Sequence, residues 1–542
     1  MKTREQALLA DLKQDLWDRR IARGMSLLEK NLPMLVSLGP EQPDAGALLG
    51  YLAQWIDLGF DNRELLARVL VKFQTPVRAQ LKLCDYLHLR MAEGLLAMAG
   101  ESFEAAIAHF DFVLMVGEEI EDKETLAIAD FWKGRCLRRK GEYDLALTCT
   151  VRGCELANSL GHPKMAAVMR VLESWLVFQK GVPQEALKIL QSAEAVLAST
   201  DDYITLGNIH SSYGRIARRE GRYHQAIDHF TRAITEYKKR DPEHRNVARS
   251  LANLAFVKRL IALELLRKLD AEIRRRKSGT AKPKPPSSRS HRKQRFEELR
   301  EEAFSHLAEA REIYARRPNH HGLGTVHLNI GYLYLDTGDL EQAENEGTAA
   351  FKLGDETKDL IIMARARLLQ CMVENAKVEE EIGGAADPGA HARSAMEFAA
   401  DAVELSKRTQ NRRLLANSYI WEGLTHCNSY FENLEAARRS YDTVMKFLKD
   451  YRPDYMREDL QRLKRRAFEA GTVNSTLRAW SQGSLGDKTF QQVTEEFAEL
   501  VIPKVWEREG RKVSRVASRL SISPKKVRRI LNRTGRKKPG NR

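Results

Sequence analysis

Small and hydrophobic residues recur along the middle of this chain with the spacing of a helical hairpin. In residues 206–241, one stripe carries side chains spaced i, i+4 and i+7: Ala226, Phe230 and Ala233. Tyr213 and Ala217 have a matching spacing in the segment before it. Gly221 lies between the two segments, where glycine is typical of a helix-ending turn. The pattern therefore predicts two helices whose small residues allow close approach.

The same positions return every forty residues. The small residues of the first helix are Gly94, Gly134, Ser174 and Gly214, the turn glycines are Gly141, Gly181 and Gly221, and the alanines of the second helix are Ala106, Ala146, Ala186 and Ala226. A bulky residue fills one further slot at Phe110, Leu190 and Phe230, with Thr150 as its weak member. This arrangement resembles the tetratricopeptide repeat family, whose short unit is about 34 residues. The resemblance implies an all-α fold, a TPR-like α-solenoid of helical hairpins of about 40 residues with slightly longer helices.

The repeats divide the chain into regions. Residues 1–75 look helical but match the repeat poorly, and either an N-terminal cap or a separate domain is consistent with them. Residues 76–470 are predicted to form the solenoid, in which Gly347 takes the bulky slot of one unit and a helix from Met456 to Ala470 ends the array. Residues 471–489 are small and polar without a period, which predicts a linker.

A basic insertion interrupts the fifth hairpin. Residues 278–293 are rich in Pro, Ser, Lys and Arg and have no apolar period, so we expect a disordered loop. Such a loop is either a solvated linker or an accessory arm that contacts nucleic acid phosphates. The sequence leaves both interpretations open.

The pattern changes in residues 490–536. An apolar stripe at Val513, Val516, Ala517 and Leu520 predicts a short helix, and a second stripe at Val527, Ile530 and Leu531 predicts another. Ser523 suits the N-cap of the second helix and Pro524 its first position. Two short helices joined by a tight turn, with basic residues facing outward on the second, match the helix-turn-helix arrangement.

This segment resembles the Fis-type helix-turn-helix at the C-terminus of many bacterial regulators. The positions that fall in register are Ser514, Arg515, Ala517, Leu520, Ile522, Ser523, Val527, Arg529, Leu531 and Gly535. The resemblance implies that residues 525–533 enter the major groove of DNA while the start of the preceding helix meets the backbone. The DNA-binding residues so implied are Ser514, Arg515, Ser523, Lys525, Lys526, Arg528, Arg529, Asn532 and Arg533. A solvated basic helix is the alternative, and residues 537–542 form a basic tail.

Two positions depart from that family. Ser521 replaces the turn glycine, so its backbone must avoid the left-handed region or accept strain. Pro503 interrupts the leading helix and is expected to kink it. Because leading helices help the family to dimerise, the resemblance leaves a homodimer open.

The solenoid offers a second candidate site. In tetratricopeptide arrays the first helix of each hairpin lines a concave groove, and that resemblance places basic and aromatic side chains there. These partner-binding residues are Arg135, Arg138, Arg139, Trp175, Phe178, Arg215, Arg218, Arg219, Lys258 and Arg259. A basic groove with aromatic residues suits an acidic peptide or helix. The same residues are equally consistent with merely solvated helix positions.

The net charge of +15 is concentrated in two segments. Residues 504–542 carry a net charge of +13 and residues 267–295 carry +10, so the rest of the chain is net acidic. This distribution favours a polyanion partner at the basic segments. Six scattered cysteines without a CxxC motif indicate reduced thiols in a cytoplasmic protein. No apolar run is long enough for a membrane span, and the charged N-terminus does not resemble a signal peptide.

No motif for catalysis or cofactor binding is evident. Residues 486–489 lack the spacing of a phosphate-binding loop and follow no predicted strand, and the His and Cys residues lack metal-ligand spacing. We therefore expect a protein that is not an enzyme and has no cofactor. The sequence predicts a DNA-binding transcriptional regulator whose solenoid binds a protein or peptide. The alternative is a scaffold protein with a nonspecific nucleic-acid-binding tail. The DNA sequence, the ligand and the direction of regulation are left undetermined.

Overall fold

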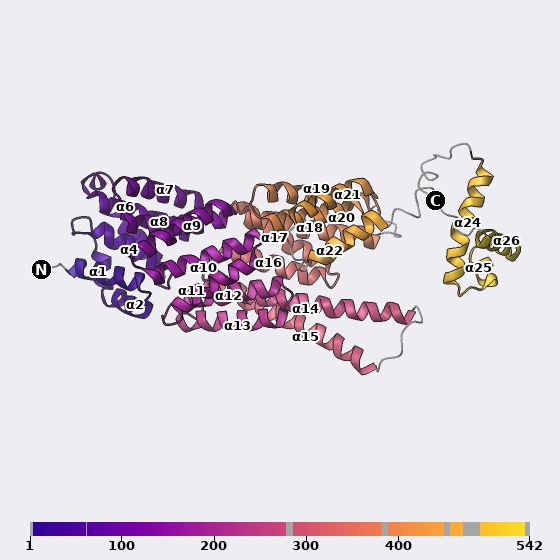
Figure 1. The fold of residues 1–542 in the computed structure, drawn as a ribbon, viewed down its shortest axis with the longest axis horizontal. Coiled ribbons are helices and arrows are strands. Elements are labelled where there is room, and N and C mark those ends of the chain that lie inside the picture. Colours follow the sequence, from indigo (N-terminus) through magenta and orange to yellow (C-terminus); the bar gives the residue numbers. More distant parts are fainter. Residues whose placement is uncertain are drawn as a thin grey trace. The chain divides into compact units, whose positions relative to one another are not determined.

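The computed structural model describes residues 4–60, 62–277, 286–381, 388–448, 456–469 and 488–536. These residues form helices and no strand (Figure 1). The chain divides into two compact units, residues 1–463 and 464–542. None of the helices in the described ranges combines the length and apolar character that a membrane crossing requires. The six cysteines form no disulfide. The predicted linker at 471–489 lies outside the described residues, apart from its last two positions.

The solenoid is built from eight pairs of helices within these ranges. The first helices of the pairs are α6 (Leu83–Ala99), α8 (Lys123–Lys140), α10 (Pro163–Lys180), α12 (Tyr203–Arg219), α14 (Arg245–Lys277), α16 (His320–Leu335), α18 (Leu360–Glu381) and α20 (Arg412–His426). The second helices are α7 (Phe103–Glu119), α9 (Tyr143–Ser159), α11 (Pro183–Leu197), α13 (Tyr223–Arg240), α15 (Pro286–Arg316), α17 (Leu340–Glu356), α19 (Gly389–Lys407) and α21 (Leu434–Phe447). The array ends with α22 (Met456–Lys464) and a short π-helical turn, Arg465–Glu469.

The pairing of small and bulky residues holds each hairpin together. A Cβ atom added to Gly94 would lie 2.7 Å from a ring carbon of Phe110, and one added to Gly214 would lie 2.8 Å from Phe230. Both phenylalanines are fully buried. A larger side chain on the first helix would therefore separate the two helices, which explains the recurring glycine.

Leu369 replaces the missing bulky residue of one hairpin. Gly347 occupies the bulky slot of the α16–α17 pair, opposite Gly331. A Cβ atom on Gly331 would lie 2.5 Å from Cδ2 of Leu369, and one on Gly347 would lie 3.5 Å from the same atom. Because Leu369 belongs to α18, the following hairpin fills the space between the two glycines.

The turn after several of the first helices has a left-handed backbone. Gly141, Gly181 and Gly221 have φ values of +87°, +99° and +76°. Glu101 occupies the same register forty residues before Gly141, with a φ of +61°. Since side chains disfavour this region, Glu101 carries strain that a glycine there would avoid.

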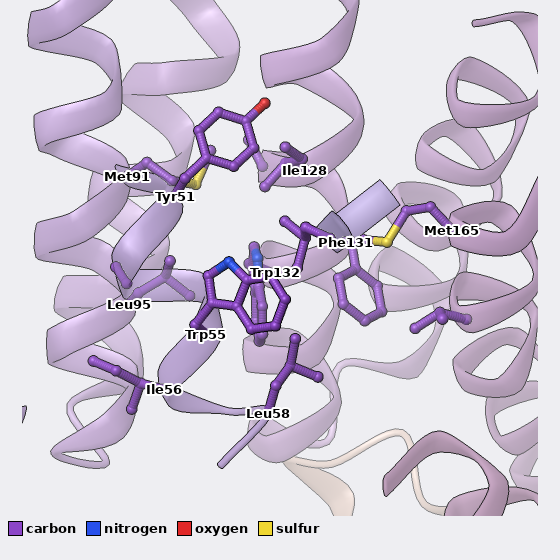
Figure 2. Close-up of a cluster of buried hydrophobic side chains, with 14 of the residues drawn as sticks. Tyr51, Trp55, Ile56, Leu58, Met91, Leu95, Ile128, Phe131, Trp132 and Met165 are labelled. Atoms are coloured by element: carbon purple, nitrogen blue, oxygen red, sulfur yellow. The ribbon is translucent and has the colours of Figure 1, made fainter. Parts of the chain in front are cut away.

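The N-terminal region precedes the repeats as a group of short helices. They are α1 (Arg4–Trp17), α2 (Ile21–Lys30), α3 (Leu32–Ser37), α4 (Ala45–Ile56), α5 (Arg63–Val71) and the 3-10 helix η1 (Val77–Gln80). One apolar core runs from Leu8 through to Tyr213 of α12, so these helices share their core with the first hairpins. Figure 2 shows Trp55 of α4 among side chains of α6 and α8, including Leu95 and Trp132. The region therefore packs onto the end of the helical stack.

The basic insertion contains less irregular chain than we expected. Residues 286–293 belong to α15, so the prediction of a disordered loop over 278–293 is wrong for that half, and residues 278–285 lie outside the described residues. Proline is tolerated in the first helical turn, where its missing N–H is not needed, and Pro286 stands there. The ion pair from Arg292 to Glu272, 2.8 Å long, then ties α15 to α14. In Figure 1 the far ends of α14 and α15 project beyond the neighbouring hairpins.

Hairpins that are distant in sequence touch one another, because the stack coils back on itself. Arg19 forms a buried ion pair with Asp202 at 2.7 Å. Nδ2 of Asn319 donates to the Glu101 carboxylate at 3.0 Å, and the backbone N–H of Gln410 donates to the Gly141 carbonyl at 3.0 Å. These ties hold successive turns of the superhelix together around its interior.

In the second unit, residues 488–536 form three helices around a small apolar core. They are α24 (Phe490–Arg508), which continues through Pro503, α25 (Val513–Arg519) and α26 (Pro524–Arg536). The buried residues are Ile502, Val516, Ala517, Val527 and Ile530. Each of the three helices contributes to this core, so α25 and α26 are held at a fixed angle by packing.

Candidate ligand cavity and cationic helix

The first helices of the hairpins enclose a cavity inside the solenoid. Its larger part has a volume of about 740 Å³ and is lined by residues of α8, α12, α14, α16, α18, α20 and α22. A smaller part of about 240 Å³ adjoins it, and Arg138, Arg215 and Arg249 line both parts. The larger part lies within the usual range of ligand pockets.

Seven of the ten predicted groove residues line this cavity: Arg135, Arg138, Arg139, Trp175, Arg215, Arg218 and Arg259. The other three do not. Arg219 is buried over the ring of Phe178, 4.6 Å from its centroid, and donates to the Phe178 carbonyl at 2.7 Å. Lys258 forms an ion pair with Glu302 of α15. These three positions point into contacts between helices, so our placement of Phe178, Arg219 and Lys258 in the groove is corrected.

Several cavity arginines are neutralised by a carboxylate. Arg135 binds both oxygens of Asp57, at 2.6 and 3.0 Å, and its guanidinium lies 4.6 Å from the centroid of the Trp132 ring. Although burial raises the pKa of the Asp57 carboxyl, Arg135 holds this pKa at about 2. Arg259 likewise binds both oxygens of Asp336, at 2.6 and 2.8 Å. These pairs are built into the wall and leave little charge for a ligand.

A second set of arginines has no such partner. Among the described residues, no carboxylate forms an ion pair with Arg138, Arg215 or Arg249. Arg138 lies 5.0 Å from the centroid of the Trp175 ring, and its buried Nε has no hydrogen-bond partner. Burial, together with the neighbouring arginines, lowers the pKa of Arg138 and of Arg215. Together these three residues form the inner arginine cluster.

The sequence analysis missed Arg249. It lies on α14 at helical spacing with Arg245, Asn253 and Phe256, and all four residues line the larger part of the cavity. This helical spacing could have predicted that Arg249 faces the cavity. It does not show which of these residues has a carboxylate partner.

Helix α22 also contributes residues to the larger part of the cavity. Asp459 and Arg462 line it, and Arg462 pairs with Glu379 at 3.3 Å. Burial raises the pKa of Asp459 to about 6, against the opposing effect of Arg462 and Arg259. The last helix of the solenoid therefore contributes directly to the wall of the cavity.

In the second unit, most of the predicted DNA-binding residues lie on two faces of α26. Lys525, Arg528 and Asn532 are exposed and spaced i, i+3 and i+7, opposite the buried Val527 and Ile530. Ser514 and Arg515 are exposed at the start of α25. We refer to Lys525, Arg528 and Asn532 as the outer stripe.

The other basic face of α26 is turned toward α24. Arg529 pairs with Glu495 at 3.3 Å, and Arg533 pairs with Glu495 at 3.1 Å and with Glu499 at 3.2 Å. Arg529 and Arg533 are thus partly neutralised within the unit, which the sequence analysis did not anticipate. Lys526 is half-buried beside them.

The turn before α26 has the geometry that its sequence requires. Oγ of Ser523 accepts from the backbone N–H of Lys526 at 3.2 Å, which caps the helix. Ser521 has a φ of +50°, so of the two options for this position it accepts the left-handed strain. Whether the unit dimerises stays a prediction.

Comparisons with known proteins bear on the solenoid. The family model described as "Tetratricopeptide repeat" matches residues 325–354, most of α16 and α17. A Rap protein complexed with Competence and Sporulation Factor has a similar fold, with 14% identity, a TM-score of 0.50, and coverage of 76% of this chain and 99% of that one. Human IFIT1 with m7Gppp-AAAA is 14% identical at a TM-score of 0.44, covering 82% of this chain and 91% of its own. No curated protein matches the chain. The fold is thus an all-α, TPR-like solenoid, as predicted.

Proposed function

We propose that this protein is a DNA-binding transcriptional regulator whose solenoid binds a peptide or protein ligand. The observation that carries the proposal is the outer stripe of α26. Its basic residues are exposed while Val527 and Ile530, on the opposite side, anchor the helix in an apolar core. An α-helix fits the major groove, where Lys and Arg bind guanine edges and phosphates.

The internal ion pairs of α26 divide its residues into two roles. Lys525, Arg528 and Asn532 would contact DNA directly, with Ser514 and Arg515 of α25 at the backbone. Arg529 and Arg533 would contribute less, because a DNA contact competes with their pairs to Glu495 and Glu499. Pairing with those carboxylates instead orients α26 on α24.

The ligand-binding role is supported by the cavity and its charge. A basic interior with an aromatic side chain, Trp175, suits a ligand that carries acidic groups. The solved Rap structure, which has a similar fold, is a complex with Competence and Sporulation Factor. In this chain we place a peptide-sized ligand in the cavity of the solenoid.

DNA binding is tested by fluorescence anisotropy of the full chain on fragments selected from a random duplex library. We expect Arg528→Gln to weaken binding at least tenfold and to reduce the slope of log affinity against log salt by about one. Arg519→Gln is the matched control, because Arg519 of α25 is also exposed but pairs with Glu509, which lies between α24 and α25. Equal affinity and equal slope for wild type and Arg528→Gln would contradict the proposal.

A scaffold protein with a nonspecific tail is the second candidate. The tetratricopeptide match and the large cavity favour it. A variant with Lys525→Gln and Arg528→Gln separates the two functions. If the protein is a scaffold, the wild-type chain binds all duplexes with the same affinity and the variant keeps its protein partners. If it is a regulator, the wild-type chain prefers one DNA sequence and the variant loses that preference.

A further inference from the structure

The inner arginine cluster brings together cationic groups from three separate hairpins. Arg138 comes from α8, Arg215 from α12 and Arg249 from α14, and all three line both parts of the cavity. The Nε atoms of Arg138 and Arg249 are buried and have no hydrogen-bond partner within the described ranges. The cluster therefore brings guanidinium groups without a carboxylate partner to the wall of the cavity.

The carboxylates that line the smaller part of the cavity already have partners. Asp57 is held by Arg135, and Glu101 by Arg139, Asn319 and His320. Within the part of the chain that the structure describes, Arg249 donates only to neutral groups, the side-chain oxygen of Asn208 at 2.7 Å and the Tyr237 hydroxyl at 3.3 Å. Like charges placed together in a buried site destabilise the folded chain unless an anion joins them. The arrangement is thus costly without a ligand.

The number and type of donors indicate the chemistry of that ligand. A single carboxylate brings one negative charge, which leaves most of the cluster uncompensated. A phosphoryl group carries a charge of about −1.5 to −2 and three strong acceptor oxygens, a good match to several guanidinium forks. Two carboxylates would have to bind at the cluster together to bring the same negative charge as one phosphoryl group.

We propose that Arg138, Arg215 and Arg249 bind a phosphoryl group carried by the ligand of the solenoid cavity. This inference rests on the proposed ligand-binding role of the solenoid. The phosphoryl group has two sources, a phosphorylated side chain of a peptide or a small phosphate ester. In either case Trp175, beside Arg138, lies next to the anchored group.

The first test compares probes on the full chain by isothermal titration calorimetry. Inorganic pyrophosphate is compared with glutarate, a dicarboxylate, at constant ionic strength. We expect pyrophosphate to bind at least tenfold more tightly; equal or tighter binding of glutarate overturns the phosphoryl assignment in favour of an acidic peptide. A phosphoserine-containing pentapeptide and adenosine 5′-monophosphate then distinguish the two sources.

Variants locate the site. Arg215→Gln and Arg138→Gln are expected to weaken pyrophosphate binding at least tenfold. Arg365→Gln is the matched control, since Arg365 of α18 lines the larger part of the cavity but not the smaller part, which the three cluster arginines also line. Arg528→Gln controls for binding to α26. Loss of pyrophosphate binding in either control, or its retention in both cluster variants, overturns the proposal.

A second measurement excludes a merely structural role for these arginines. Because Arg215 has like-charged neighbours and no carboxylate partner, Arg215→Gln should raise the Tm of the ligand-free chain while it lowers affinity. A lowered Tm would show that Arg215 holds the fold together. DNA affinity measured in the same samples separates the phosphoryl-binding hypothesis from the proposed regulator function. If the chain binds DNA sequence-specifically but does not bind pyrophosphate, only the phosphoryl-binding hypothesis is rejected.

Discussion

Glu101 joins two turns of the superhelix at the expense of its own backbone. It stands in the register of Gly141 with a φ of +61°, and its side chain is 11% exposed. Its carboxylate accepts from Arg139 at 3.2 Å, from the Asn319 amide at 3.0 Å and from the backbone N–H of His320 at 3.0 Å. The left-handed backbone costs roughly 1–2 kcal/mol. Glutamate is favourable at this position only if the free energy gained from its contacts with α16 is larger than the cost of the strained backbone.

Two substitutions separate the strain from the contacts. Glu101→Ala keeps the strained backbone and removes the contacts, and we expect the free energy of unfolding to fall by about 3 kcal/mol, since a hydrogen bond to a charged group contributes about 1.5–3 kcal/mol and Arg139 loses its partner. Glu101→Gly also removes the contacts but relieves the strain, so its loss should be about 1 kcal/mol smaller.

Glu121 provides the matched control. It has a φ of +57° and is exposed, and its side chain forms no bond to another described residue. Glu121→Gly should therefore stabilise the chain by about 1 kcal/mol. Guanidinium titrations followed by circular dichroism give the free energies, and hydrogen exchange at the start of α16 gives a local readout. The reasoning is refuted if Glu101→Ala lies within about 0.5 kcal/mol of wild type, the scatter of ordinary surface substitutions.

Three further predictions test the turn, the wall and the repeat. Ser521→Gly should stabilise the three-helix unit by about 1 kcal/mol, seen as slower amide exchange in α25 and α26, because it relieves a φ of +50°; unchanged exchange would contradict this. The pKa of Asp57 is lowered from 3.8 to about 2, so the stability that Asp57 adds over Asp57→Asn is present above pH 4 and should be lost as the pH falls toward 2; a difference that does not change over this range argues against the Arg135 pair. Gly94→Ala should cost about 1–3 kcal/mol in thermal or chemical unfolding, because its Cβ would lie 2.7 Å from Phe110, whereas Gly100→Ala, whose Cβ would be 3.5 Å from its nearest neighbour, should be nearly neutral.

The sequence by itself determined the local structure of the repeats. The forty-residue register of small, apolar and turn residues predicted the hairpins, because helix periodicity and left-handed turns depend on residues a few positions apart. The same kind of local signal predicted α25, α26 and the Ser523 cap. Local sequence failed at residues 286–293, which we expected to be a disordered loop. These residues belong to α15, where Arg292 forms an ion pair with Glu272 of α14, and composition alone does not indicate that contact.

The tertiary structure decided which charges remain available. The sequence placed ten residues in one groove, but contacts between helices took Arg219 and Lys258 out of it and paired Arg135 with Asp57, 78 positions away. Pairing with Glu495 likewise distinguishes Arg529 from Arg528, its neighbour in sequence. Ion pairs of this kind depend on how the superhelix coils and how α24 packs, and these long-range arrangements have no signature in local spacing. The chemistry of the candidate sites therefore follows from the arginines that folding leaves without a carboxylate.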